Sequence, residues 1–451
     1  MVLNKAISIG REKRPETWDL IRAIENAQHP RACGSPGLNF RSSRIIRCER
    51  KGLLTILANV KTEIRRHPVA FRFVIVLGVM SLFADVTYEG ARSVNGQFLQ
   101  SLGASALIVS TVAGLGELAG YGLRFLSGRW VDRGHAYWPI TLFGYAINLL
   151  AVPALALAGH WLVAAALMLL ERTGKAIRNP PRDAMLSHAA HEIGSGWAFG
   201  LHEALDETGA ALGPLLVAFV LWSRGGYHIA FAMLLVPAMV SLALLLFARH
   251  LNPRPRDLEP VSHTIAMRGF AGDYWLLAAA GALTAAGFAD FSLMAYHLAK
   301  HNILAQAAIP LLYALANGMN AASSLGLGRA FDARGPRVLA VTILLPLASA
   351  PLVFFGGVPA ILLGIALWSL GVTVQETLFK AMLTSLVSAQ RRASGFGTFD
   401  GMWGVASFAG SLLLGYLYDV SLIWLVTASV SLQVAAVPLV WLITRRRKSA
   451  R

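Results

Sequence analysis

The sequence predicts an all-α membrane protein with twelve transmembrane helices in two pseudo-symmetric six-helix bundles. Three observations lead to this prediction: an apolar composition, a regular succession of spans as long as a bilayer is thick, and an internal repeat. Of the 451 residues, 55% are hydrophobic and only 14% are charged, with a mean hydropathy of +0.56. Soluble domains carry about 25% charged residues. The composition therefore excludes a water-soluble enzyme.

The charge is strongly basic, with 40 Lys and Arg against 24 Asp and Glu. Such an excess favours nucleic acid or an anionic membrane surface as a partner. The apolar background decides for the lipid bilayer, so we expect no nucleic-acid partner. Residues 1–66 are basic and lack an uninterrupted apolar core, which predicts a cytosolic N-terminal extension. The two cysteines, Cys33 and Cys48, lie in this extension and imply no disulfide framework.

Apolar stretches of roughly 20 residues recur from about residue 70, and each can cross a bilayer core of about 30 Å. Backbone polar groups in hydrocarbon need internal partners, so these spans should be helices. The first six predicted spans are 70–93, 104–126, 138–157, 161–182, 195–222 and 228–249. The second six are 274–299, 305–327, 338–356, 357–386, 393–420 and 421–444.

The distribution of Lys and Arg predicts the orientation. The turns after even-numbered spans carry most of the basic residues, for example Arg129 and Arg133 after the second span, and the chain ends on Arg445 to Lys448. Basic turns face the cytoplasm, so both termini are expected in the cytosol. We predict a first bundle at 67–249, a cytosolic linker at 250–272, a second bundle at 273–444 and a basic tail at 445–451.

Short motifs of the first half recur at equivalent places in the second half. Phe83-Ala84-Asp85 recurs as Phe288-Ala289-Asp290, and Gly128-Arg129-x-x-Asp132 recurs as Gly328-Arg329-x-x-Asp332. Long-period self-similarity indicates a repeat architecture. Two six-helix halves in the same orientation are typical of parallel-repeat transporters, whose substrate site lies between the halves near the midplane.

The segment Gly128 to Gly134, GRWVDRG, resembles the loop signature of the major facilitator superfamily, and Gly328 to Gly335 resembles its degenerate second copy. The first copy departs from the family pattern at His135-Ala136-Tyr137, where further basic residues are usual. The resemblance implies a bacterial secondary transporter that works by alternating access. It also implies that the loops form an inner gate, with the candidate residues Gly128, Asp132, Arg133, Gly328, Asp332 and Arg334.

Ionisable groups at the bilayer centre cost about 2.5–3.5 kcal/mol on insertion scales, so each requires a partner or a water-filled cavity. Span one holds Asp85, Glu89 and Arg92. Glu89 and Arg92 are three residues apart, the spacing of an ion pair within one helix, and such a pair can be purely structural. Asp85 has no obvious local partner, and its counterpart Asp290 suggests a shared architectural role.

Span four carries four ionisable residues on one face, Glu171, Lys175, Arg178 and Arg182. The last two are interpreted as anchors at the inner leaflet. Glu171 and Arg172 lie near mid-depth, where snorkelling would need more reach than their side chains have. We therefore expect both to face the central cavity. Pro180 and Pro181 are predicted to break the helix.

Span five places His202 and Asp206 on one face and Glu203 on the neighbouring one. A histidine beside a carboxylate is either a proton-handling pair or a hydrogen-bonded packing pair. The hypothesis is that Glu203 or Asp206 takes up and releases a proton, with Arg172 or Lys175 as the alternating cationic partner.

The second half is poorer in charge, with Glu376 and Asp400 as its candidates beside Asp290. Aromatic residues occupy several places where the first half has ionisable ones, and they are expected to form an apolar wall or simply to pack. This wall includes Trp368, Phe379, Phe399 and Trp403. If the asymmetry is functional, the ligand is amphiphilic or mildly anionic.

The sequence shows no nucleophile motif, metal-ligand set or nucleotide fingerprint, so we expect neither an enzyme, nor a metal, nor a cofactor. The predicted function is secondary active transport of a small organic molecule, proton-coupled export of a drug or metabolite, by a monomer in the inner membrane. The alternatives are proton-coupled uptake of a metabolite and a non-transporting sensor or assembly protein. The candidate substrate and proton pathway comprises Asp85, Glu89, Glu171, Arg172, Lys175, His202, Glu203, Asp206, Asp290, Glu376 and Asp400.

Overall fold

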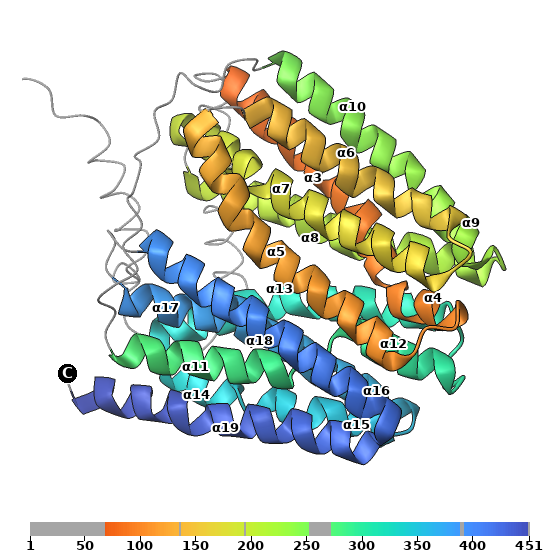
Figure 1. Cartoon of the computed structure of the whole chain (residues 1–451). Coiled ribbons are helices and arrows are strands. Elements are labelled where there is room, and N and C mark those ends of the chain that lie inside the picture. Colours follow the sequence, from red (N-terminus) through yellow and green to blue (C-terminus); the bar gives the residue numbers. More distant parts are fainter. Residues whose placement is uncertain (1–67, 135–136, 194, 252–271, 388–391, 450–451) are drawn as a thin grey trace, which may run out of the picture. The chain divides into compact units, whose positions relative to one another are not determined.

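The computed structural model describes residues 68–134, 137–193, 195–251, 272–387 and 392–449. The chain divides into two compact units, residues 1–63 and 64–451, and every described residue belongs to the second. These residues form helices and no strands (Figure 1). The predicted N-terminal extension and nearly all of the predicted linker lie outside the described residues.

The first half contains six helical spans within the described residues, and the first of them is followed by a short helix, α4. The longest span has 33 residues. In chain order the helices are α3 (Pro68–Arg92), α4 (Asn95–Ser101), α5 (Ala106–Gly134), α6 (Tyr137–Ala154) with the 3-10 turn η1 (Leu155–Leu157), α7 (Trp161–Ile193), α8 (Ser195–Trp222), and α9 (Gly226–Met233) continued by α10 (Leu235–Leu251).

The second half repeats this plan with more interrupted helices. In chain order they are α11 (Gly272–Gly287) followed by α12 (Phe291–Lys300), α13 (Ala308–Arg334), the broken span α14 (Arg337–Thr342), η3 (Leu345–Ala348) and α15 (Ser349–Phe355), the span α16 (Val358–Thr373), η4 (Val374–Phe379) and α17 (Lys380–Leu386), then α18 (Arg392–Val420) and α19 (Leu422–Ser449). The segment η4 is a π-helix.

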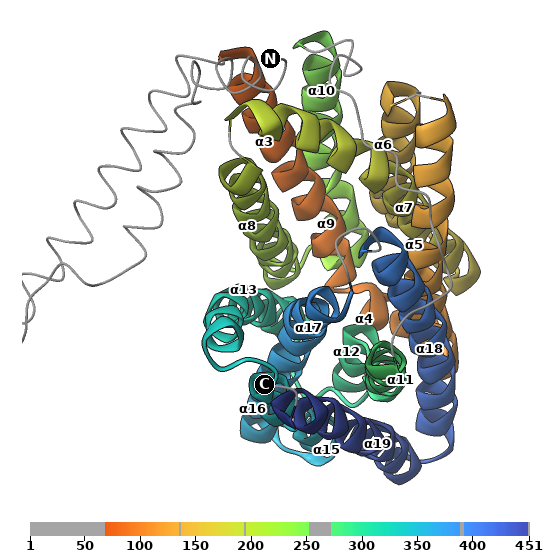
Figure 2. The same ribbon diagram turned by 90° about the vertical axis from the view of Figure 1, so that its left-hand side faces the viewer.

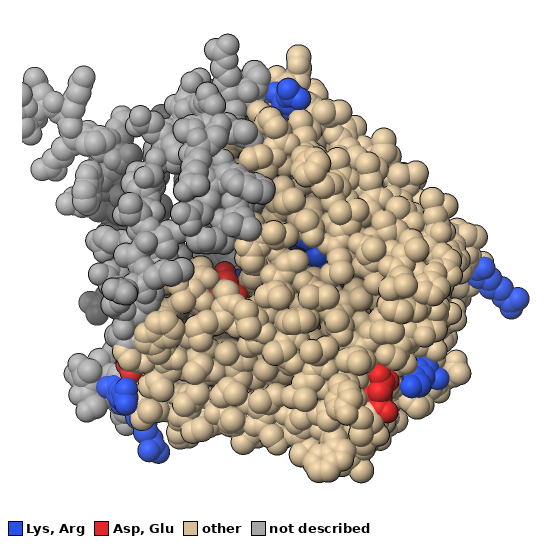
Figure 3. All heavy atoms as spheres, viewed as in Figure 1, with Lys and Arg blue, Asp and Glu red and all other residues tan. Residues whose placement is uncertain are grey.

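Nine helical spans within the described residues are long and apolar enough to cross a membrane. The spans formed by α7, α13 and α18 have 33, 27 and 29 residues and are long enough, but they are more polar than the other nine. Large apolar side chains such as Phe143, Phe219 and Trp424 are more than half exposed. Figure 3 shows a face on which charged side chains lie mostly at the margins. The chain is an integral membrane protein.

Within the described part of the chain, the two halves share a hydrophobic core at one end. One cluster joins residues of both halves, including Phe98 of α4 and Phe291 of α12. The other two clusters each belong to a single half. Figures 1 and 2 show α4 and α12 side by side at the end where the halves meet. We call this the closed end. Among the described residues no hydrophobic cluster joins the halves at the opposite end, which we call the open end.

Close helix contacts hold the halves together along two seams, α5 against α18 and α8 against α13. Gly114 lies against Ser411, and Gly415 lies against Ser110, so each helix offers a glycine to the other. At the closed end, the Asp419 carboxylate accepts hydrogen bonds from the first two backbone N–H groups of α5, at 3.3 and 3.1 Å. This contact across the halves caps the helix.

Two expectations about helix ends are wrong. Pro180 and Pro181 lie inside α7, which continues to Ile193. Neighbouring helices can satisfy the backbone groups that proline frees in a membrane helix. The signature segments are helical rather than looped, because α5 runs to Gly134 and α13 to Arg334. The second of these helices ends at Gly335, whose φ of 68° favours glycine.

Candidate functional site

A cavity of about 1090 Å³ lies between the two halves. Its first wall comes from α3, α5, α7 and α8, and its second from α11, α13, α16, η4, α17 and α18, with Asp290 at the start of α12. It extends from Arg92 and Tyr313 near the closed end to Asp183 and Lys380 near the open one. Carboxylates outnumber basic groups in its lining, and most of both come from the first wall.

Arg92 joins three carboxylates near the closed end of the cavity. Its guanidinium nitrogens lie 3.3 Å from Glu117, 3.6 Å from Asp290 and 3.9 Å from Glu89. The expected pair within α3 is therefore present, as one contact of a larger network. Tyr313 of α13 donates a hydrogen bond to Glu89 at 2.7 Å. Asp290 also caps α12 by accepting from the Ser292 backbone N–H. These contacts connect the halves.

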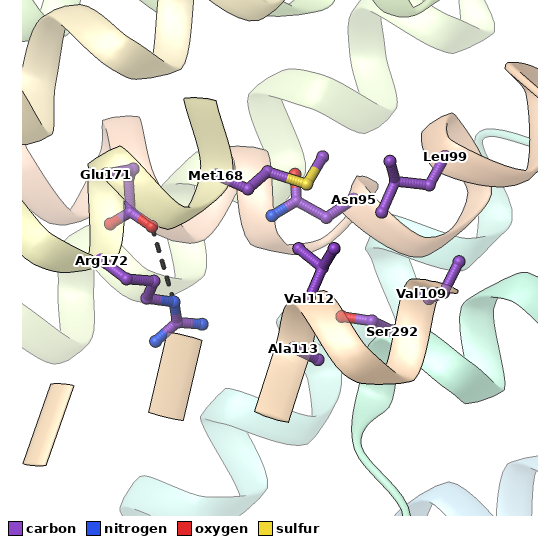
Figure 4. A pocket seen from close by; sticks show the side chains of 9 residues that line it. All are labelled: Asn95, Leu99, Val109, Val112, Ala113, Met168, Glu171, Arg172 and Ser292. Atoms are coloured by element: carbon purple, nitrogen blue, oxygen red, sulfur yellow. Dashed lines mark ion pairs between the residues drawn. The ribbon is translucent and has the colours of Figure 1, made fainter. Parts of the chain in front are cut away.

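Arg172 and Glu171 have different environments although they are adjacent. Arg172 lines the cavity and lies 3.3 Å from Glu117 of α5. Glu171 lines a small pocket of about 20 Å³ beside α4 and α5, which Arg172 also lines, and its carboxylate lies 3.5 Å from Nε of Arg172. Figure 4 shows Glu171 and Arg172 at one end of this pocket and Leu99 at the other. Asn148 donates to the Glu171 carboxylate at 2.7 Å. The expectation that Glu171 faces the central cavity is therefore not met.

Arg178 is buried in the first half, not anchored at a membrane surface. Only 1% of the residue is exposed, and its guanidinium stacks 4.1 Å from the Tyr145 ring centre. Its closest charged partner is Asp85, at 4.0 Å. Lys175, one turn away, places its Nζ 3.3 Å from the ring centre of Tyr88. Stacking on an aromatic face stabilises a buried guanidinium through a cation–π contact.

Asp206 pairs with Arg182, not with the expected Arg172 or Lys175. An Asp206 oxygen lies 3.9 Å from Arg182 and 3.4 Å from Nδ1 of His202. The other ring nitrogen of His202 lies 3.1 Å from the Ser81 hydroxyl. Arg182 also contacts Asp183 at 2.7 Å, so it takes part in a network and is not a simple anchor. Glu203 is exposed and lines the cavity.

The second wall is more aromatic and carries amide groups. Trp368, Phe399 and Trp403 line the cavity, whereas Phe379 is fully buried and packs against the last two rings. Trp368 donates its indole N–H to the Ala289 carbonyl at 2.9 Å. The wall presents apolar rings opposite the charged first half, as the sequence predicted for three of the four aromatics.

Glu376 and Asp400 both line the cavity. Glu376 lies in η4 and accepts a hydrogen bond from Asn320 of α13 at 3.2 Å. Single π-helical turns occur frequently at functional sites. Here the turn brings Gln375 and Glu376 to the cavity side by side.

The model of the Major Facilitator Superfamily matches residues 74–344. The chain belongs to this superfamily. It is 40% identical over 381 residues to an uncharacterized protein of Mycobacterium tuberculosis, covering 83% of this chain and 93% of that protein. An uncharacterized MFS-type transporter of Methanocaldococcus jannaschii is 27% identical over 359 residues, covering 77% and 89%. Multidrug resistance protein MdtH of Aeromonas hydrophila is 24% identical over 349 residues, covering 74% and 86%.

The fold agrees with this assignment. The crystal structure of the nucleoside transporter NupG superposes with a TM-score of 0.68, at 11% identity, covering 83% of this chain and 99% of that one. The helical spans of the described residues, arranged in two halves, are consistent with the twelve helices of the major facilitator fold, and the chain is a transporter of this superfamily.

The superfamily's signature residues lie at the ends of α5 and α13. Gly128, Asp132 and Arg133 fall in the last part of α5, whose side chains lie outside the described ones. Asp332 and Arg334 are exposed at the end of α13. Gly328 approaches Thr377, with 3.9 Å to the methyl group from an added Cβ. The role of these residues as gate latches stays a prediction.

Several cavity residues escaped the sequence reasoning. Glu117 interrupts an apolar span as Glu171 does, so the same search for deep charges could have found it. Tyr313 gave no signal, because a tyrosine within an apolar span is unremarkable until its hydroxyl is seen to bond Glu89. Arg178 was noticed but assigned to the membrane surface, because its spacing from the span end fits an anchor equally well.

Proposed function

We propose that this transporter moves a small organic molecule through the cavity between its halves, coupled to protons, by alternating access. The observation that carries the proposal is the cavity itself: about 1090 Å³, with ionisable groups on one wall and aromatic rings on the other. Binding sites of this size accommodate drug-sized molecules. Charged residues within a membrane span mark substrate or proton pathways.

The paired groups of the first wall support proton coupling. Asp206 faces both Arg182 and His202, at 3.9 and 3.4 Å. A carboxylate in a low-dielectric site holds a proton more readily when its cationic partner moves away. Rocking of one half against the other would change such distances, and the proton would be bound in one state and released in the other. Glu203, exposed in the same cavity, is the second candidate.

Two directions of transport have support. Export agrees with the likeness to multidrug resistance protein MdtH. The positive-inside pattern of the turns supports an open end that faces the cytosol, where an exporter would load its compound. Uptake is the second candidate. It is favoured by Arg178, whose closest carboxylate, Asp85, lies as far away as 4.0 Å, so that Arg178 could bind an anionic substrate.

Proteoliposomes containing the purified chain test the proposal. Internal pH is recorded while a panel of small organic compounds is added under an imposed proton gradient. We expect at least one compound to produce a proton flux that disappears in the double variant Glu203→Gln/Asp206→Asn. The matched control is Asp273→Asn, which removes a carboxylate paired with Arg446 at 3.1 Å and remote from the cavity lining.

The sign of the flux decides the direction, since an exporter exchanges its compound for protons and an importer carries both inward. A flux that persists in the double variant would remove Glu203 and Asp206 from the coupling. The absence of flux with every compound would contradict the proposal and favour the non-transporting sensor or assembly protein.

A further inference from the structure

Four cations follow one another along α7 on the cavity side, and they are held very differently. The first, Arg172, lies 3.3 Å from Glu117, and the last, Arg182, lies 2.7 Å from Asp183. Between them, Lys175 has no carboxylate within 4.0 Å among the described residues, and Arg178 has only Asp85 at that limit. The two central cations are thus the ones without a close anionic partner.

Arg178 is the more unusual of the two. None of its three guanidinium nitrogens makes a hydrogen bond within the described part of the chain, although the residue is only 1% exposed. A buried charge without hydrogen bonds is costly. Tyr145 fixes the guanidinium from one face, at 4.1 Å, and leaves its N–H edges unused. These donors lack an acceptor, because Asp85 at 4.0 Å is too far away for a hydrogen bond.

We propose that Arg178 and Lys175 form a subsite for the anionic group of the substrate, a carboxylate or a phosphate, and that Asp85 binds one proton whenever this subsite is filled. The inference rests on the proposed function, because it assigns the subsite to the same cavity. An oxygen of the anion accepts hydrogen bonds from the Arg178 guanidinium. Guanidinium groups bind both anions in this way.

Charge balance links the anion to the proton. When the anion binds to Arg178, it neutralises the cation that faces Asp85 and brings a negative charge close to it. Both changes favour the protonated form of Asp85. The proton comes from water and adds to one carboxylate oxygen of Asp85, with no bond broken in the substrate. The anion and the proton together leave the net charge of the site unchanged.

Among the charged groups around Asp85, the other carboxylates already have close partners, so Asp85 is the one that can take up the proton. These charged groups are Lys175 and Arg178 of α7, Asp206 of α8 and Glu89 on the same helix, all of which line the same cavity as Asp85. Glu89 is held by Tyr313 at 2.7 Å and by Arg92. Asp206 is held by Arg182 and His202.

The aromatic side chains of the opposite wall indicate the rest of the substrate. Trp368, Phe399 and Trp403 face the cavity and suit an apolar or aromatic body. The substrate is then an amphiphilic organic anion. Because the anion and the proton bind in the same state, they travel in the same direction. An inward proton gradient would drive uptake, the second of the two directions above.

The test measures binding to the purified full chain in detergent, and it needs no transport. Three ligands of similar size are compared: phenylbutyrate, phenyl phosphate and phenylbutylamine. We expect at least one of the two anions to raise the melting temperature at millimolar concentration and the amine to have no effect. Which anion binds distinguishes a carboxylate from a phosphate. In weakly buffered solution, binding should remove about one proton per protein, and affinity should rise about tenfold for each unit of falling pH.

Variants separate the parts of the inference. Asp85→Asn should still bind the anion, without proton uptake and without pH dependence. Arg178→Lys and Lys175→Met should each weaken binding by about tenfold or more, as expected when hydrogen bonds between charged groups are lost. The matched control is Lys300→Met, since Lys300 also lies over tyrosine rings, at 5.3 and 5.4 Å, but outside the cavity. Should Arg178→Lys fail to fold, Lys175→Met carries the same test.

Binding of the amine alone, or of no ligand, would overturn the inference. Anion binding that is equally pH-dependent in Asp85→Asn would overturn the role of Asp85. Anion binding without any compound-driven flux in proteoliposomes would contradict the proposed function and leave the subsite standing. Flux of non-anionic compounds without anion binding would support the proposed function and contradict the subsite.

Discussion

The closed end depends on a glycine, and replacing that glycine should open it. Gly96 of α4 lies against the backbone of Ser292 in α12. A Cβ atom added to Gly96 would overlap the Ser292 carbonyl oxygen, and it would lie 2.7 Å from the carbonyl carbon and 2.9 Å from the Cα. The variant Gly96→Ala therefore pushes the two halves apart where they are joined.

The magnitude follows from the overlap. Carbon atoms in contact lie about 3.5–4.0 Å apart, so α4 and α12 must separate by roughly 1 Å, and the neighbouring atoms are backbone that cannot rotate away. Forcing a methyl group into packed structure costs about 1–3 kcal/mol. If the open state relieves this strain, the ratio of closed to open molecules falls by about 5- to 150-fold.

Pulsed electron paramagnetic resonance on nitroxide labels measures this ratio. The labels are attached at Ser101→Cys and Gln306→Cys, both exposed near the closed end, after Cys33 and Cys48 have been replaced by Ser. Gly96→Ala should enlarge the long-distance population. The control Gly122→Ala adds the same methyl to a helix where nothing lies within 4 Å, and so matches the change in helix propensity. Identical distance distributions in both variants would refute the reasoning.

Three further substitutions probe single contacts. Asp419→Ala removes the cap from the start of α5 and should destabilise the closed state by about 1 kcal/mol. The same spin labels should then report more long distances. An unchanged distance distribution would mean that the cap does not stabilise the contact between the halves. Gly209→Ala places a methyl against the Leu82 carbonyl within the first half and should lower the melting temperature without altering the label distances; a change in distance would contradict this assignment. Trp368→Phe deletes the hydrogen bond to Ala289 and should lower the free energy of unfolding by about 1 kcal/mol; unchanged stability would show that the indole N–H finds another acceptor.

Hydropathy predicted the helices because lipid imposes a simple rule on the chain. Every span of the prediction corresponds to a helical segment, including α7, α13 and α18, which are more polar than the nine apolar spans. Local breaker rules failed at Pro180 and Pro181, which α7 contains. In a bundle, packing and neighbouring helices can compensate for the hydrogen bond that proline removes, and a single sequence does not show those neighbours.

The site was predicted by residue type but not by pairing. Charges within apolar spans singled out Asp85, Arg172 and Asp206, which line the cavity, and their part in transport stays a prediction. Their partners depend on how α3, α5, α7 and α8 cross, and this crossing is absent from the sequence. For that reason Asp206 was assigned Arg172 or Lys175, whereas the structure gives it Arg182.

The central claim is that the cavity between the halves is the path of the substrate, and blocking it with a covalent label tests this most directly. After Cys33 and Cys48 have been replaced by Ser, single cysteines are placed at Ala321, which lines the cavity, and at Leu315 on the same helix, which is 62% exposed and does not line it. Both proteins are treated with a bulky thiol reagent, and compound-driven proton flux is measured in proteoliposomes. The label at Ala321→Cys should abolish the flux and the label at Leu315→Cys should leave it intact. Equal flux through both labelled proteins would contradict the claim.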